Sequence, residues 1–232
     1  KHQQLGHLQD IYDGKSFTTT EGVFSTSGSI TQLDKLAKIT PEKLIVDEAH
    51  SLGILGKNGR GATNSFQISY KNCPICIFPL GKAFGGAGAV VCTTEVIAEY
   101  LIQFARNYIY TTALPPHTLA TIGAAYRELE HNSDAIKKLQ DNISTLQKSI
   151  LDAQLTPHFI PSQSAIHCCV IKGNKATKDV AALLQQNKFD VKAILSPTVP
   201  KGQERLRICL HSYNKKEDIK ALVALLKECL TP

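Results

Sequence analysis

The sequence predicts an α/β fold with a small α+β domain in its carboxyl-terminal part. Short apolar runs that suit buried strands alternate with segments of helical spacing, which is typical of α/β sheets. A long amphipathic segment at residues 133–152 follows, and the pattern changes again after Pro157. We therefore expect one domain at residues 1–132 and a second at 133–232, with 133–152 as the linking helix.

The first domain contains four expected strands. β-branched or apolar runs predict strands at 16–20, 44–47, 76–80 and 89–92. Residues 31–38 suit a short helix, and a further helix is expected from about 117 to 130. Between them, after Thr94, apolar residues recur on one helical face: Ile97, Tyr100, Leu101, Phe104 and Tyr108.

The second domain is expected to be a small βαββα unit. Its linking helix has an apolar stripe with alternating spacings of three and four residues: Ile136, Leu139, Ile143, Leu146 and Ile150. Strands are expected at 165–171, 191–195 and 205–210, and a helix at 177–187. A last helix is expected from Asn214, with Glu217 placed as in a capping box.

Composition narrows the class of protein. The chain of 232 residues has a net charge of +6 and no block of five like charges, so no nucleic-acid arm is expected. No apolar run approaches the ~20 residues that span a bilayer, and no secretion signal opens the sequence. We expect a cytoplasmic protein that binds neither membrane nor nucleic acid.

The cysteines predict reduced thiols. They number seven, an odd count, and two of them are the adjacent pair Cys168 and Cys169. Cys73 and Cys76 have the CxxC spacing, but no second pair completes a zinc site. We therefore expect no metal, and we interpret these two residues as small buried apolar side chains.

Three polar residues stand where two of the expected strands end. Asp47 closes strand 44–47, His50 follows three residues later, and Lys82 lies in a glycine-rich turn after strand 76–80. In open α/β sheets, ligands bind just beyond the carboxyl ends of the strands. Asp47, His50 and Lys82 are therefore candidates for one small-molecule site.

Residues 47–50 also spell the DEAH box of helicase-type ATPases, in which the Asp holds Mg²⁺ and the Glu polarises water. Such proteins need a phosphate loop of the form GxxxxGK followed by Ser or Thr. Around Lys82 that form is broken, because Cys76 stands where the first Gly is required and Ala83 follows the lysine. An ATPase of this kind is thus the disfavoured alternative.

Six segments of the chain occur in an order known from one enzyme family. They are residues 20–25, 46–51, 56–61, 80–85, 110–116, and 197–200 followed by 205–207. Together they resemble the α-oxoamine synthase family of enzymes that depend on pyridoxal 5'-phosphate (PLP), and the resemblance covers nearly the whole chain. It implies the aspartate aminotransferase-like fold, with part of the large mixed-sheet domain followed by a small α+β domain.

The resemblance implies cofactor-binding and catalytic roles for the strand-end residues. Asp47 would keep the pyridine nitrogen of PLP protonated, because a nearby carboxylate raises the pKa of that nitrogen. His50 would donate a hydrogen bond to the phenolic oxygen of the ring. Lys82 would bind the cofactor as an imine and later move the Cα proton of the substrate.

Further roles follow from the same resemblance. Arg207 would bind the substrate carboxylate in a forked pair; Arg205 competes for this role, because alternation places both side chains on one face of a strand. Ser25 resembles a serine near the cofactor ring. Thr111 or Thr112 would reach the cofactor phosphate of a partner subunit in a homodimer.

Within the family the likeness is greatest to the branch that serves biotin synthesis. It implies condensation of L-alanine with pimeloyl-CoA, or the equivalent acyl-carrier thioester, to give 8-amino-7-oxononanoate, CoA and CO2. Two departures are visible. Pro79 stands three residues before the lysine, where the family has Thr or Ser for the phosphate. The family's first part, roughly 150 residues or about a domain, has no counterpart, so we expect residues 1–232 alone to be inactive. A non-catalytic fragment of such a synthase is a further alternative.

Overall fold

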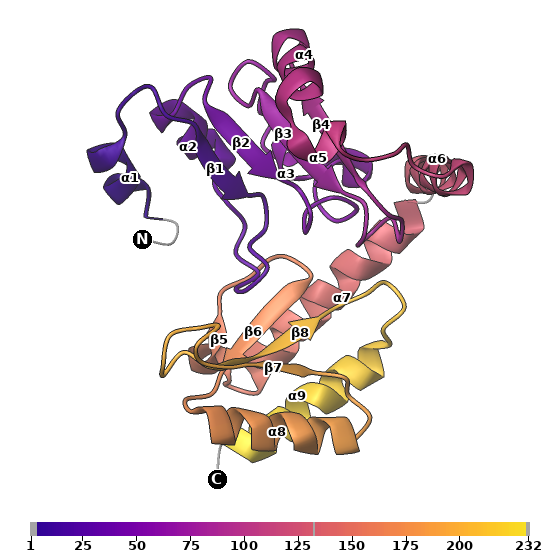
Figure 1. Cartoon of the computed structure of the whole chain (residues 1–232). Coiled ribbons are helices and arrows are strands. Elements are labelled where there is room, and N and C mark those ends of the chain that lie inside the picture. Colours follow the sequence, from indigo (N-terminus) through magenta and orange to yellow (C-terminus); the bar gives the residue numbers. More distant parts are fainter. Residues whose placement is uncertain (1–3, 132, 231–232) are drawn as a thin grey trace. The chain divides into compact units, whose positions relative to one another are not determined.

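The computed structural model describes residues 4–131 and 133–230 (Figure 1). They form two compact units. The first unit contains the described residues up to Val23 and those from Thr31 to Ser133, and the second contains Phe24–Ile30 and the described residues from Asp134 onward. No helix among the residues described is long and apolar enough to cross a membrane.

The first unit is built on a four-stranded sheet of order β1-β2-β3-β4. Its strands are β1 (Thr18–Glu21), β2 (Leu44–Asp47), β3 (Ile75–Pro79) and β4 (Ala89–Thr93). β1, β2 and β3 are parallel, whereas β4 runs antiparallel to β3. Because the parallel strands share one direction, Glu21, Asp47 and Ile77 are register partners near the carboxyl edge of the sheet.

Helices precede, connect and follow these strands. They are α1 (Leu5–Ile11), α2 (Leu33–Ile39), α3 (Ala62–Ser65), α4 (Glu95–Phe104), α5 (Arg106–Ile109) and α6 (Pro116–His131), with a 3₁₀ turn η1 (Lys57–Gly59) before α3. Buried side chains of β2, α2 and α3 form an apolar core of this unit together with Cys73: Leu33, Leu36, Ala37, Leu44, Val46, Ala62 and Cys73. The sheet predicted from the apolar runs is therefore present, and α3 was not predicted.

The helical segment after Thr94 differs from the prediction in two respects. It is two helices, because Ala105 has an extended backbone between α4 and α5. Its apolar face is not covered by the described chain, since Tyr100, Phe104 and Tyr108 are each more than 60% exposed (62%, 64% and 63%). The segment is helical, as its periodicity predicts, but periodicity alone does not say what covers the apolar face.

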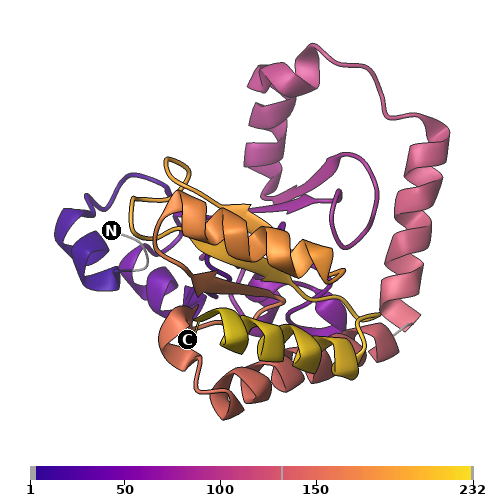
Figure 2. The same ribbon diagram turned by 90° about the horizontal axis from the view of Figure 1, so that it is seen from below.

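The second unit is a four-stranded antiparallel sheet of order β5-β6-β8-β7 with three helices. Its strands are β5 (Phe159–Ile160), β6 (Ile166–Val170), β7 (Lys192–Ile194) and β8 (Arg205–Cys209), and its helices are α7 (Ser133–Asp152), α8 (Asn174–Gln186) and α9 (Lys216–Leu230), with a 3₁₀ turn η2 (Thr156–His158) before β5. Figure 2 shows α8 and α9 side by side across one face of this sheet. The edge strand β5 was not predicted, because two residues carry no periodic signal.

Within this unit His167 on β6 is only 2% exposed, and its Nε2 has no hydrogen-bond partner in the described part of the chain. Burial lowers the pKa of His167 to about 4. The ring therefore packs in its neutral form at neutral pH, because charging it without a partner would be costly.

Phe24–Ile30 belongs to the second unit, although the sequence places it within residues 1–132. The carbonyl oxygen of Thr26 accepts a hydrogen bond from Arg205 Nη1 at 3.1 Å and one from Cys168 Sγ at 3.4 Å. The carbonyl oxygen of Gly28 accepts from Ser164 Oγ at 2.8 Å. Phe24–Ile30 therefore has to be added to the second domain. Its backbone carbonyls attach it to β6 and β8, and the pattern of side chains in the sequence does not show such contacts.

Gly28 is a position where a larger residue does not fit. Its φ is +76°, and a Cβ built there would lie 1.9 Å from the carbonyl oxygen of Ile166. Gly14 is a matched control, because its φ is +73° but nothing lies within 4 Å of a built Cβ. Gly14→Ala should lower the free energy of unfolding by about 1 kcal/mol through backbone strain alone. Gly28→Ala should lower it by about 2 kcal/mol more through the added overlap.

Urea unfolding of both variants measures the difference. Equal losses in the two variants would show that the segment does not lie against β6 as described.

Candidate active site

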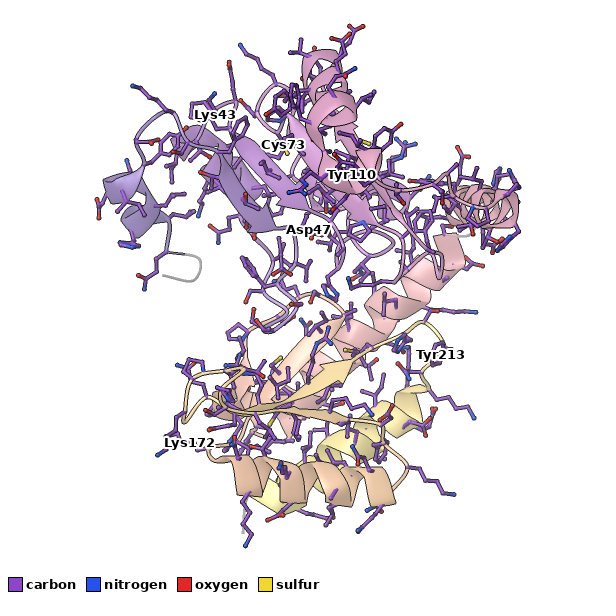
Figure 3. The ribbon with its side chains drawn as sticks, viewed as in Figure 1. Lys43, Asp47, Cys73, Tyr110, Lys172 and Tyr213 are labelled. Atoms are coloured by element: carbon purple, nitrogen blue, oxygen red, sulfur yellow. The ribbon has the colours of Figure 1, made fainter. Side chains whose placement is uncertain are left out.

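Asp47 is the last residue of β2 and lies at the carboxyl edge of the first unit's sheet (Figure 3). It is half-buried, and its Oδ1 accepts a hydrogen bond from the backbone N–H of Ala49 at 2.8 Å. Its register partners are Glu21 on β1 and Ile77 on β3. The carboxylate therefore occupies the strand-end position where ligands bind in parallel sheets.

Glu48, the next residue, is fully buried, with 0% exposure. Its Oε2 accepts hydrogen bonds from Ser51 Oγ and from Ala62 N, the latter at 2.7 Å. Its Oε1 accepts from Thr63 N at 2.7 Å and Thr63 Oγ1 at 2.6 Å. These bonds satisfy the first backbone N–H groups of α3, which have no partner within the helix. Glu48 thus joins the turn after β2 to the start of α3.

The sequence did not indicate that Glu48 supports the candidate site. The glycines at positions 22 and 61 carry the signal that could have found it. A Cβ at Gly22 would lie 2.9 Å from Glu48 Oε2, and one at Gly61 would lie 2.7 Å from it. Two glycines that leave room for one side chain indicate a group buried between backbone segments.

Glu48 also bears on the ATPase alternative. In that interpretation the glutamate polarises a water molecule, which requires a carboxylate with a free lone pair facing the ligand. Here the four hydrogen bonds to Ser51, Ala62 and Thr63 occupy the carboxylate in the interior. The geometry therefore does not support the ATPase interpretation.

The turn that carries His50 and the loop that carries Lys82 pack against each other. Leu52, Leu80 and Phe84 form one buried apolar cluster, and a Cβ built at Gly53 would lie 2.6 Å from the Cβ of Ala83. Leu52 is two residues after His50, and the other two members of the cluster lie two residues on either side of Lys82. The structure thus brings the segments of His50 and Lys82 together at the edge that also carries Asp47.

Backbone hydrogen bonds shape the lysine loop. Leu80 donates its N–H to the carbonyl of Gly88 at 3.0 Å, and Gly86 donates to the carbonyl of Leu80 at 2.9 Å. Gly85 and Gly88 have φ values of +59° and +95°, which glycine adopts without strain. The cluster buries Leu80 and Phe84 while the Lys82 side chain stays exposed. Its amine is thus available to a ligand.

Pro79 is accommodated at the end of β3 for a simple reason. Leu80 directs its N–H toward Gly88, so the nitrogen of Pro79 faces the other side, toward β2. The last bond between β2 and β3 there is from Glu48 N to the carbonyl of Ile77, at 2.8 Å. The missing N–H of Pro79 therefore costs no ladder hydrogen bond. It also leaves no hydroxyl at this position.

Thr111 and Thr112 lie in the exposed loop between α5 and α6. The loop passes close to the glycines behind Lys82, because Leu114 Cδ1 lies 3.3 Å from a Cβ built at Gly88. Thr111 Oγ1 donates a hydrogen bond to the carbonyl of Thr112 at 3.5 Å. Both threonines belong to the first unit, as do Asp47, His50 and Lys82.

In the second unit the two candidate arginines on β8 differ in their partners. Both lie near Cys168, whose pKa burial raises to about 11 against the opposing effect of the two guanidinium groups. Arg205 is 6% exposed and donates to the carbonyls of Gln203 and Thr26, at 2.9 and 3.1 Å. Arg207 Nε has no hydrogen-bond partner among the residues described. Arg205 therefore holds the segment that contains Ser25, and Arg207 retains an unused donor.

Solved structures place this architecture in a known class. The structure matches serine palmitoyltransferase from Sphingomonas wittichii with a TM-score of 0.85 at 22% identity, over 97% of this chain and 57% of that one. A structure of a lysine-to-alanine variant of serine palmitoyltransferase from S. paucimobilis, with a TM-score of 0.85 at 22% identity over 97% of this chain and 57% of that one, contains a bound PLP–myriocin aldimine. The fold is that of the PLP-dependent transferases, as predicted.

The family follows from the sequence comparisons. The model of the family "Aminotransferase class I and II" matches residues 1–226, and the chain belongs to this family of PLP-dependent enzymes. A crystal structure of 8-amino-7-oxononanoate synthase from Francisella tularensis is 57% identical, with a TM-score of 0.90, over 98% of this chain and 67% of that one.

Curated relatives agree with that structure. The 8-amino-7-oxononanoate synthase of Serratia proteamaculans is 35% identical over 98% of this chain and 60% of its own length. The putative enzyme of that name from Methanocaldococcus jannaschii is 38% identical over 98% of this chain and 62% of its own length. The chain thus spans about three fifths of the length of these relatives.

Removing the Glu48 carboxylate should destabilise the first unit. Glu48→Ala leaves the backbone N–H groups of Ala62 and Thr63 buried without their acceptor, so we expect the free energy of unfolding to fall by about 3 kcal/mol or more. Glu42→Ala is the control, because Glu42 forms only an exposed ion pair with Lys71, at 3.1 Å. That change should alter stability by less than about 1 kcal/mol.

Denaturant unfolding followed by circular dichroism checks both values. A Glu48→Ala variant as stable as Glu42→Ala would contradict the anchoring role given to Glu48.

Proposed function

We propose that the protein containing residues 1–232 is a PLP-dependent acyltransferase that condenses L-alanine with a pimeloyl thioester. The products are 8-amino-7-oxononanoate, the released thiol carrier and CO2. One observation carries the proposal: the segments of His50 and Lys82 pack together through Leu52, Leu80 and Phe84, at the strand edge that carries Asp47. The names of the relatives supply the product, and the two substrates are those that the resemblance to the biotin-synthesis branch implies.

The residues at this edge fit PLP by their chemistry. A carboxylate at the end of β2, an imidazole three residues later and an exposed primary amine are the groups needed to stabilise a protonated pyridine, to hydrogen-bond its phenolic oxygen and to bind its aldehyde carbon. Asp47, His50 and Lys82 would hold the cofactor in these three ways. Pro79 supplies no hydroxyl, so the phosphate would be held by other groups.

When bound, PLP supplies an electron sink that stabilises negative charge on the amino acid's Cα. The residues of the chain hold the cofactor, move the proton and bind the substrate. Asp47 keeps the ring nitrogen protonated by stabilising its positive charge. Lys82, on its glycine-flanked loop, accepts the Cα proton, and its exposed amine is free to return one. Arg207, whose Nε has no hydrogen-bond partner among the described residues, binds the substrate carboxylate.

The proposal includes a homodimer. The exposed loop with Thr111 and Thr112 follows the uncovered aromatic residues of α4 and α5, and in this proposal it reaches the phosphate of the cofactor bound by a second copy. Ser25 lies in the segment held by Arg205 through Thr26, and in the proposal it contacts the cofactor ring. Sedimentation velocity of the protein should show a dimer, and a monomer would contradict this part.

Lys82 is tested by reductive labelling. We expect borohydride reduction of the PLP-loaded protein to leave a pyridoxyl group on Lys82, which peptide mass spectrometry locates. Lys82→Ala should abolish the label. Lys57→Ala should retain it, because Lys57 is another exposed lysine, on the loop after β2. A folded protein that takes no label, or takes it on another lysine, would overturn the proposal and favour a non-catalytic role.

Substitution of the two arginines should have different effects on KM and on stability. Arg207→Lys retains the charge but loses the forked geometry, so we expect KM for L-alanine to rise about 10- to 100-fold with little change in stability. Arg205→Lys should instead lower the free energy of unfolding by about 1 to 2 kcal/mol and leave KM within about threefold. The opposite result would assign the substrate carboxylate to Arg205.

A further inference from the structure

Cys73 and Cys76 form a close thiol pair outside the candidate active site. Their Sγ atoms are 3.3 Å apart, and Cys73 Sγ also lies 3.3 Å from the carbonyl oxygen of Ile75. The pair lies where β3 begins, whereas Lys82 follows its other end. Figure 3 accordingly shows Cys73 at the edge of the sheet away from Asp47. Cys73 is buried in the apolar core of the first unit and Cys76 packs against that core, as expected from the sequence, and the two thiols are also in contact with each other.

The contact between the two thiols shifts their pKa values in opposite directions. The hydrogen bond with Cys76 lowers the pKa of Cys73, and the same contact, together with burial, raises the pKa of Cys76. Burial raises the pKa of every other thiol in the described chain, to about 11 for Cys168 and about 12 for Cys169. Since the thiolate is the reactive form, Cys73 is the favoured nucleophile.

A metal is a poor occupant for this pair. Among the residues described, no group of three or more His, Cys, Asp or Glu side chains is placed to hold a metal ion. Two thiols already in contact need only a small closure to reach the S–S bond length of about 2.0 Å. The geometry therefore favours oxidation over metal coordination.

We propose that Cys73 and Cys76 are a peroxide-sensitive dithiol that forms an intramolecular disulfide. The Cys73 thiolate attacks one oxygen of a hydroperoxide, the O–O bond breaks, and Cys73 becomes a sulfenic acid as the other oxygen leaves with a proton as water or alcohol. The Cys76 sulfur then attacks the Cys73 sulfur, and water leaves with the Cys76 proton. Two thiols are oxidised by two electrons, which reduce one hydroperoxide.

The dithiol is connected to the carboxylate that anchors the site. The Thr63 hydroxyl lies against Cys76, and Thr63 also donates two hydrogen bonds to Glu48. Cys76 also pairs across the sheet with Cys92 on β4. Oxidation of Cys76 thus changes the environment of Thr63, which is hydrogen-bonded to Glu48. Because Glu48 holds the turn after β2, the disulfide can affect the candidate active site.

Trypsin provides a direct readout, because cleavage after Lys71 and Lys82 releases one peptide, residues 72–82, with both thiols and no other cysteine. The protein is treated with hydrogen peroxide, remaining thiols are alkylated, and the digest is analysed by mass spectrometry. We expect peptide 72–82 to be two hydrogens lighter and unalkylated, and dithiothreitol to restore alkylation. It should react at least about tenfold faster than the exposed Cys209 in peptide 208–215.

Variants separate the two steps. Cys76→Ser should accumulate a Cys73 sulfenic acid that dimedone traps, whereas Cys73→Ser should leave Cys76 alkylatable. Cys92→Ser is the matched control and should form the disulfide at the wild-type rate. If peptide 72–82 stays alkylatable while Cys209 oxidises in a protein that is folded by circular dichroism, or if Cys92→Ser abolishes the reaction, the proposal is wrong.

Discussion

A carboxylate removed from water is costly unless hydrogen bonds replace its hydration, and Glu48 obtains all of its replacements from two short segments of chain. Ser51 lies in the turn after β2, while Ala62 and Thr63 begin α3. The loop between them, residues 52–61, is thereby closed at both ends. The same loop carries Leu52, which packs against the two residues that flank the Lys82 loop. The position of Lys82 relative to His50 therefore depends on Glu48, a residue that is fully buried.

Neighbouring carboxylates at positions 47 and 48 have different environments because they stand where a strand becomes a turn. Asp47 is the last strand residue and remains half-buried at the carboxyl edge of the sheet. Glu48 donates its N–H to Ile77 and turns its side chain into the interior. A sequence motif such as DEAH specifies only residue types. The environment of each side chain decides whether a carboxylate binds a ligand or supports the backbone.

The second unit shows a similar division between two like residues. Arg205 and Arg207 lie on one face of β8, but Arg205 binds the carbonyls of Gln203 and Thr26. It thereby attaches the segment with Ser25 to a sheet that begins more than a hundred residues later in the chain. The Nε–H group of Arg207 has no hydrogen-bond acceptor within the described structure. A buried donor without a partner suits a ligand that arrives with its own acceptor.

The sequence by itself determined the strands of the first sheet, the stripe of α7 and the strand-end positions of Asp47 and Lys82, because apolar periodicity and glycine-rich turns are local properties. Their likeness to a family pointed to the PLP-dependent transferases, which the comparisons confirmed. Only the tertiary structure decided the burial of Glu48, the contact of Cys73 with Cys76, the different partners of the two arginines, and the assignment of Phe24–Ile30 to the second unit. Three of these depend on backbone groups or on residues distant in the chain, which leave no trace in local periodicity. The CxxC spacing is visible in the sequence, but the local backbone conformation decides whether the two thiols meet.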